Sequence, residues 1–173
     1  MLKTIYCILL MLLSITGLAQ KSSPCSEDSI YHTLDFWLGT WEVYDEEKKT
    51  LLGKNSIQKE LNGCAITEHW KSMEGGEGRS LFYVDNKTKN WKQVWVTINA
   101  NEPMGQKEKT LIESAINSVL FEGSYPYNGI TLLDRTRLTE LPSGDVKQEI
   151  MISSDAGKNW RTIFMGTYQK EIK

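Results

Sequence analysis

Polar side chains that could orient a bound molecule alternate with aromatic ones along several segments of the chain. In the segment Trp91-Lys92-Gln93-Val94-Trp95, the two tryptophans and the glutamine recur at every second position. Glu68 and Trp70 have the same spacing. Residues two apart share one face of a β-strand, so each of these polar groups would lie beside an indole ring on an inward, apolar-rich face. The same alternation adds three further residues: Gln148, Phe164 and Tyr168.

An inward-facing glutamate needs partners, because burying a polar group without a hydrogen bond costs free energy. One interpretation is a satisfied interior network, in which Glu68 pairs with an arginine such as Arg135 or bonds to Tyr168. The other is a cavity with tryptophan walls and a few orienting polar groups, which is typical of a small-molecule site. The alternation around Arg135 leaves its direction open. The candidate ligand-binding residues are therefore Glu68, Trp70, Trp91, Gln93, Trp95, Arg135, Gln148, Phe164 and Tyr168.

The sequence lacks the usual patterns of catalytic and metal-binding sites. Its two histidines, His32 and His69, are not spaced with cysteine or with each other as metal ligands are. No G-x-S-x-G motif occurs, and the glycines at 75–78 lack the strand–helix context of a phosphate loop. We therefore expect no catalytic residue, no metal site and no cofactor, and a binding protein rather than an enzyme.

The elements that must position these residues are mostly strands. A helix is predicted over 26–38, because Ser26 can cap it and Gly39 can end it. After Gly39 the apolar residues recur at every second position, as in strands. Short turn sequences such as Asn62-Gly63 separate the alternating segments. The expected strands are 41–44, 53–61, 64–73, 80–84, 91–98, 110–114, 118–123, 130–141, 146–153 and 160–171, with a loop at 125–129. About ten strands joined by short links predict a barrel or a sandwich.

The first nineteen residues are typical of a signal peptide. Lys3 precedes an apolar run at 5–15, and Thr16-Gly17-Leu18-Ala19 fits a cleavage site. We expect an N-terminal segment at 20–25 and one domain over 26–173, in a periplasmic or secreted protein. The net charge of −2 becomes −3 when Lys3 is removed. Without a basic cluster, neither nucleic-acid binding nor attachment to an anionic membrane surface is expected, and no later apolar run is long enough to span a bilayer.

Two of the three cysteines, Cys25 and Cys64, remain after the signal peptide. In an oxidising compartment a lone pair of cysteines is most simply a disulfide, and we expect one here. The alternative is a pair of free thiols.

The segment Leu34-Asp35-Phe36-Trp37-Leu38-Gly39-Thr40-Trp41-Glu42-Val43 resembles the opening of bacterial proteins that carry a lipocalin-like (calycin) domain of unknown function, a group distantly similar to nitrobindin. Further matches follow in order along nearly all the mature chain: Leu61-Asn62-Gly63-Cys64, Glu68-x-Trp70, Gly78-x-Ser80-x-x-Tyr83, Trp91-x-Gln93-x-Trp95, Asp134-Arg135, Gln148 and Ser154-Asp155-x-Gly157-x-x-Trp160.

The resemblance implies an antiparallel up-and-down barrel of about ten strands with a short N-terminal helix plugging one end. Related calycins bind lipophilic molecules, so a small apolar ligand is the first expectation. A haem or nitrogen-oxide protein is the second, although the nitrobindin histidine lies late in the chain and this sequence has none after His69. An enzyme that uses the barrel cavity is the third, and a structural or partner-binding barrel also stays open.

Overall fold

Strands make up most of the computed structural model, which describes residues 23–47 and 49–171. The predicted signal peptide at 1–19 lies outside the described residues, as do residues 20–22. Within the described part of the chain, no helix is long and apolar enough to cross a membrane.

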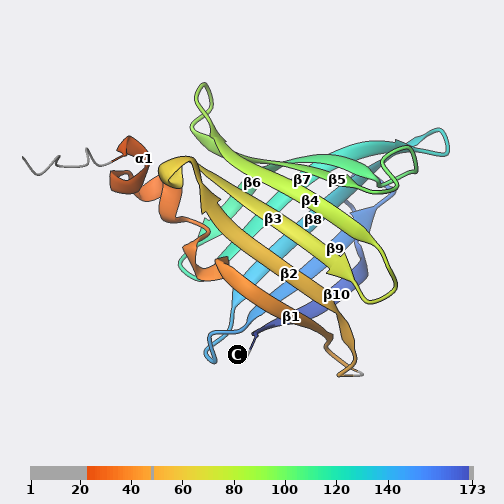
Figure 1. Ribbon diagram of the computed structural model, residues 1–173. Helices are drawn as coiled ribbons and strands as arrows, with labels where there is room; N and C mark the ends of the chain where they lie inside the picture. Colours follow the sequence, from red (N-terminus) through yellow and green to blue (C-terminus); the bar gives the residue numbers. More distant parts are fainter. Residues whose placement is uncertain (1–22, 48, 172–173) are drawn as a thin grey trace, which may run out of the picture.

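Ten antiparallel strands close into a barrel, which confirms the predicted calycin-like architecture (Figure 1). Each strand pairs with its neighbours in the chain, and the first strand pairs with the last. Closure leaves no free sheet edge, so every strand is hydrogen-bonded on both sides. The strands are β1 (Gly39–Asp45), β2 (Leu51–Glu60), β3 (Ala65–Ser72), β4 (Glu77–Asp85), β5 (Asn90–Thr97), β6 (Gln106–Ala115), β7 (Ser118–Tyr127), β8 (Ile130–Glu140), β9 (Val146–Ser153) and β10 (Arg161–Lys170).

The predicted single helix over 26–38 is wrong, because that segment consists of three short turns. These are α1 (Pro24–Glu27) and the 3-10 helices η1 (Ser29–His32) and η2 (Asp35–Trp37). Asp28 ends the first turn with an extended backbone, and its carboxylate accepts a hydrogen bond from the Ile30 backbone N–H at 3.1 Å. Aspartate offers the backbone this local alternative to a continuous helix. Leu34 breaks the segment again with φ −108° and ψ 11°.

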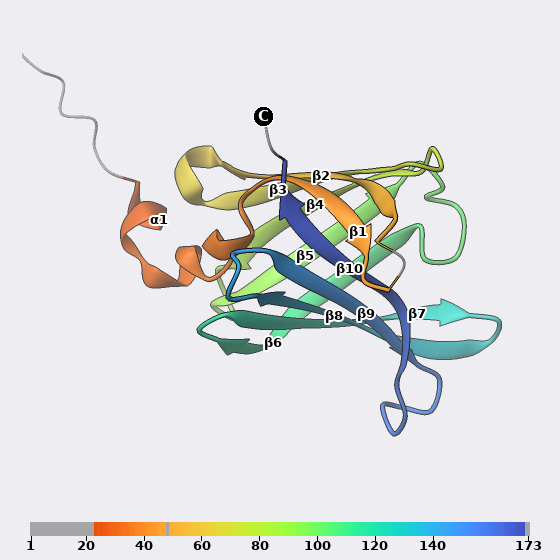
Figure 2. The same cartoon turned by 90° about the horizontal axis from the view of Figure 1, so that it is seen from below.

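These turns form a cap that lies across one end of the barrel in both views (Figure 1, Figure 2). Trp37 is fully buried there, with its ring 5.6 Å from Phe82 and 6.1 Å from Tyr168, measured between ring centroids. The predicted disulfide is confirmed: Cys25 is bonded to Cys64, which directly follows the short helix η3 (Leu61–Gly63). The bridge therefore fixes the start of the cap to the turn between β2 and β3.

The turn between β7 and β8 is shorter than predicted. Residues 125–127 continue β7, so the expected loop at 125–129 shrinks to Asn128 and Gly129. Both have positive φ, 49° and 79°. Asparagine and glycine tolerate this backbone region and form the tight turns that suit twisted hairpins.

A bulge in β10 reverses the direction of the side chains before it. Thr162 pairs with Met151, but Phe164 pairs with Ile150, so Ile163 is an extra residue in the ladder. One extra residue moves the preceding side chains to the opposite face. Alternation from Phe164 alone predicts that Thr162 and Trp160 face inward, which is wrong, because the bulge turns Thr162 to the outer face, where it bonds to Glu149.

Candidate functional site

The barrel interior is layered along its axis, and single strands carry all the layers. From the cap outward, β3 presents Ile66, Glu68 and Trp70, each two residues after the last. β5 presents a similar series, in which the polar Gln93 lies between the aromatic Trp91 and Trp95. Residues two apart share one face of a strand, so both series point inward. The layers therefore stack on the cap in the order apolar core, polar layer and aromatic rim. The polar layer consists of Asn55, Glu68, Ser80, Gln93, Lys109, Thr136 and Gln148, all buried.

A cavity of about 130 Å³ lies between the polar layer and the aromatic rim and is partly open to solvent. Two alternatives that the sequence left open, an interior hydrogen-bond network and a cavity, are both present, because the network forms the floor of the cavity. Seven of the nine candidate residues line the cavity: Glu68, Trp70, Gln93, Trp95, Gln148, Phe164 and Tyr168.

Glycines explain why the rim aromatics leave this space empty. The Trp95 ring covers Gly78, where a Cβ would come within 2.3 Å of the ring. The Trp70 ring covers Gly53 in the same way, at 2.6 Å. Each indole thus lies against the backbone of the neighbouring strand instead of projecting across the barrel. The ring of Phe164 meets that of Trp70 edge to face, with centroids 6.5 Å apart.

The floor of the cavity is a chain of hydrogen bonds that joins side chains of six strands. Gln93 Nε2 donates to Ser80 Oγ at 3.0 Å, and Ser80 Oγ donates to Glu68 Oε2 at 2.6 Å. Asn55 Nδ2 donates to Glu68 Oε1 at 2.8 Å and to the Tyr168 hydroxyl at 3.3 Å. A final bond runs from the Tyr168 hydroxyl to Gln148 Oε1, at 2.7 Å. Glu68 is therefore held by its neighbours and not by Arg135.

Burial sets the protonation of this floor. It raises the pKa of the Glu68 carboxyl above its usual range, and the hydrogen bonds from Ser80 and Asn55 offset only part of that rise. Burial likewise raises the pKa of the Tyr168 hydroxyl. Desolvation disfavours the charged form of both groups, so the floor of the cavity tends toward neutrality.

Sequence reasoning missed the residues that bring charge to the cavity. Lys107 and Lys109 line it together with the uncharged Thr136, and buried Asp134 lies beside both lysines. A strand over 106–115 would have indicated the lysines, since alternation from the buried Leu111 places both on the inner face. The strand predicted from the sequence begins only at 110, after both lysines.

Arg135 and Trp91, two of the candidate residues, do not belong to the cavity. Arg135 lies on the outer face, where its Nε donates to Glu122 at 2.7 Å and its guanidinium stacks 4.0 Å from the Trp160 ring. Trp91 lies under the cap, fully buried, and its Nε1 donates to the Ile30 carbonyl at 2.9 Å. The alternation along β5 correctly predicted that Trp91 faces inward, but it did not predict how far along the barrel axis Trp91 lies.

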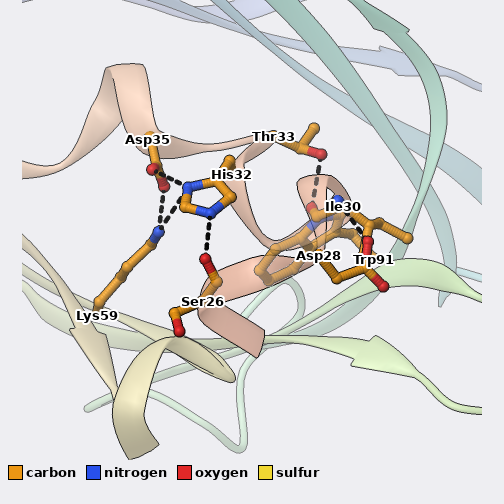
Figure 3. A network of polar contacts seen from close by, with 8 residues as sticks. All are labelled: Ser26, Asp28, Ile30, His32, Thr33, Asp35, Lys59 and Trp91. Atoms are coloured by element: carbon orange, nitrogen blue, oxygen red, sulfur yellow. Dashed lines mark hydrogen bonds and ion pairs between the residues drawn. The ribbon is translucent and has the colours of Figure 1, made fainter. Parts of the chain in front are cut away.

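The cap carries a separate polar network on its exposed side (Figure 3). His32 Nδ1 lies 2.7 Å from Asp35 Oδ2, its Nε2 lies 3.2 Å from the Ser26 carbonyl, and Lys59 Nζ lies 2.6 Å from Asp35 Oδ1. The hydrogen bond that the His32 ring donates to Asp35 is the main cause that raises the pKa of His32. The network ties the cap to β2 through Lys59.

Neither histidine reaches the cavity. His69 alternates outward from Glu68, and its Nε2 pairs with Glu77 on the outer face at 2.5 Å. Residues 23–47 and 49–171 contain no group of three or more histidine, cysteine or acidic side chains that could hold a metal ion. A haem ligand of the nitrobindin kind thus has no counterpart among the residues that line the cavity.

The sequence matches no known family model and no curated protein.

Proposed function

We propose that this barrel is an exported binding protein for a small molecule about the size of one ring, and that it is a divergent calycin. The observation that carries the proposal is the partly open cavity with aromatic walls and an ordered polar floor. Apolar walls with a few fixed polar groups are the usual composition of small-molecule sites. The Cys25–Cys64 disulfide supports export, because such bonds persist in oxidising compartments.

The size of the cavity narrows the expected ligand. A protein cavity of about 150 Å³ holds a benzene molecule, so a cavity of about 130 Å³ takes one ring with few substituents. Fatty acids, retinoids, sterols and haem are far larger. A ligand of roughly nine heavy atoms reaches micromolar affinity at about 0.9 kcal/mol per atom, which is below the ceiling of about 1.5 kcal/mol per atom. Micromolar binding is therefore the expected range.

Tryptophan fluorescence tests the proposal directly. Of the six tryptophans, only Trp70 and Trp95 line the cavity. Titration of the exported protein with indole, benzyl alcohol and benzoate should give a saturable change, and palmitate should give none. The Trp95→Phe variant should lose most of the change, whereas Trp160→Phe, on the outer face, should retain it. Flat titrations with every ring-sized compound up to millimolar concentration would refute the proposal.

A further inference from the structure

The cavity contains two lysines that share one carboxylate. Lys107 and Lys109 are two apart on β6 and therefore face the same way. Lys107 Nζ lies 2.5 Å from Asp134 Oδ2, and Lys109 Nζ lies 2.6 Å from Asp134 Oδ1. The three side chains are nearly inaccessible, with 10%, 4% and 1% of their surfaces exposed. The cluster is thus built into the wall of the barrel and is unlike a pair of surface ions.

A glycine makes this cluster possible. Asp134 is on β8, two strands away from Lys109, and Gly123 on β7 pairs with both residues. A Cβ at Gly123 would come within 3.0 Å of Lys109 Cγ and 2.0 Å of the Glu108 carbonyl. Because Gly123 has no side chain, the Lys109 ammonium reaches across β7 to the carboxylate.

The charges in the cavity do not balance. Two ammonium groups share the Asp134 carboxylate, and Glu68 is the only acid among the residues that line the cavity. Burial raises the pKa of Glu68, which favours its neutral form. Burial also lowers the pKa of Lys109, to about 8, with Asp134 opposing the fall, so Lys109 is mostly protonated at pH 7. With Glu68 in its neutral form, one positive charge is left over in a poorly solvated space, where an uncompensated ion is destabilising.

The ammonium groups also have donors to spare. Among the described residues, Lys109 Nζ donates to Asp134 and to Thr136 Oγ1, both at 2.6 Å, which uses two of its three N–H groups. Lys107 Nζ contacts Asp134 and lies 5.6 Å from the centroid of the Tyr125 ring. An acceptor in the cavity would therefore meet N–H groups that the protein does not occupy.

We propose that the ligand is an anion: a single-ring carboxylate whose acid group binds at Lys107 and Lys109 and whose ring lies among Trp70, Trp95 and Phe164. This inference rests on the proposed function and adds the ligand's charge to it. A charge-assisted hydrogen bond in a water-poor site is stronger than a neutral one, so the acid group should dominate recognition.

The test compares benzoate with benzamide, its neutral counterpart of nearly the same shape, by isothermal titration calorimetry at pH 7. Benzoate should bind at least tenfold more tightly to the wild-type protein. Lys107→Met leaves Lys109 and Asp134 as a balanced pair, so it should remove the preference for benzoate while benzamide binding persists. Lys107→Arg should restore the preference. Lys71→Met, which removes the same charge from an exposed position on β3, should leave it unchanged.

The remaining outcomes separate this inference from the proposed function. If benzamide binds the wild-type protein as tightly as benzoate does, the inference fails and the proposed function stands. If neither compound binds but indole or benzyl alcohol does, the inference alone fails, and if none of the four binds, both fail. If inorganic phosphate or sulfate binds as tightly as benzoate, the cluster is a site for small anions, and the ring-bearing acid is excluded. Circular dichroism of each variant confirms that it is folded before its affinity is compared.

Discussion

The Trp95 ring occupies the space that a side chain at Gly78 would need, since a Cβ at Gly78 would come within 2.3 Å of the indole. Gly78 and Trp95 belong to neighbouring strands, β4 and β5. The width of the cavity therefore depends on a residue that contributes no atoms to its lining.

The variant Gly78→Ala should close the cavity. The added methyl group would push the Trp95 ring toward the barrel axis, so ligand binding should be lost and stability should fall by about 1–3 kcal/mol, as is usual for overpacking. Urea denaturation and the fluorescence titration measure the two effects. Gly76→Ala is the matched control in the same hairpin, because a Cβ there meets only Ser72 Cβ at 3.4 Å. A Gly78→Ala protein with unchanged affinity would contradict this account of the rim.

Glu68 should make the protein less stable as the pH rises. Burial raises its pKa in the folded state, so the folded protein retains a proton that the unfolded chain releases above about pH 4.3. Stability contributed by this group should therefore fall as the pH rises from that value through the folded pKa. Glu68→Gln removes the titrating group. The stability of the variant relative to the wild-type protein should therefore increase between pH 4 and pH 7. Urea midpoints at several pH values give the difference, and a constant difference would mean that the pKa is not raised.

The Lys109–Asp134 pair should be costly to break from one side. Asp134→Leu should destabilise the fold by about 3–5 kcal/mol, because it leaves Lys107 and Lys109 buried without their carboxylate. The double variant Lys109→Met/Asp134→Leu should be more stable than Asp134→Leu, which leaves two buried ammonium groups. The exposed pair of Arg137 and Glu113 provides the comparison, with an expected coupling of about 0–1 kcal/mol. A double-mutant cycle measures both couplings, and equal values would rule out the special role of the buried pair.

The disulfide should stabilise the cap and, through it, the barrel. Closing a loop of 39 residues contributes roughly 4 kcal/mol in the chain-entropy model. Replacing both Cys25 and Cys64 with serine should lower the free energy of unfolding by that order. A reducing agent should lower the stability of the wild-type protein and leave the variant unaffected. The exported protein should also contain no free thiol under denaturing, non-reducing conditions, and two titratable thiols would show that the bridge does not form there.

Asp155 should keep its charge to unusually low pH. Hydrogen bonds from the backbone and side chain of Asn159 and from the Ser153 hydroxyl lower its pKa to about 2. The stability it contributes should be complete above its unfolded value near pH 3.9 and should be lost as the pH falls through about 2. An NMR titration of the carboxyl carbon reads the pKa directly. Asn159→Ala should move it part of the way back up, since the backbone N–H of residue 159 still donates, and an unchanged value in that variant would exclude the Asn159 side chain as a cause.

The alternation of apolar and polar residues predicted the strands and their inward faces well, because it depends only on residues that are close together in the sequence. The spacing of Glu68 with Trp70 and of Gln93 with Trp95 was enough to indicate their faces. The cap was mispredicted because the Asp28 side chain competes with helical hydrogen bonds, an effect that helical spacing does not show. The lysine cluster depends on strand register, since Lys109 and Asp134 are 25 residues apart and meet only where both flank Gly123.

The cap has a kinetic consequence. Trp37 and its neighbours fill one end of the barrel, so a molecule in the cavity can enter and leave only past the rim of Trp70, Trp95 and Phe164. A space that holds one ring has no room for two molecules to pass each other. An incoming molecule must wait until the occupant has left. The exchange rate at saturation should therefore equal the spontaneous dissociation rate, and no excess of competitor should speed it.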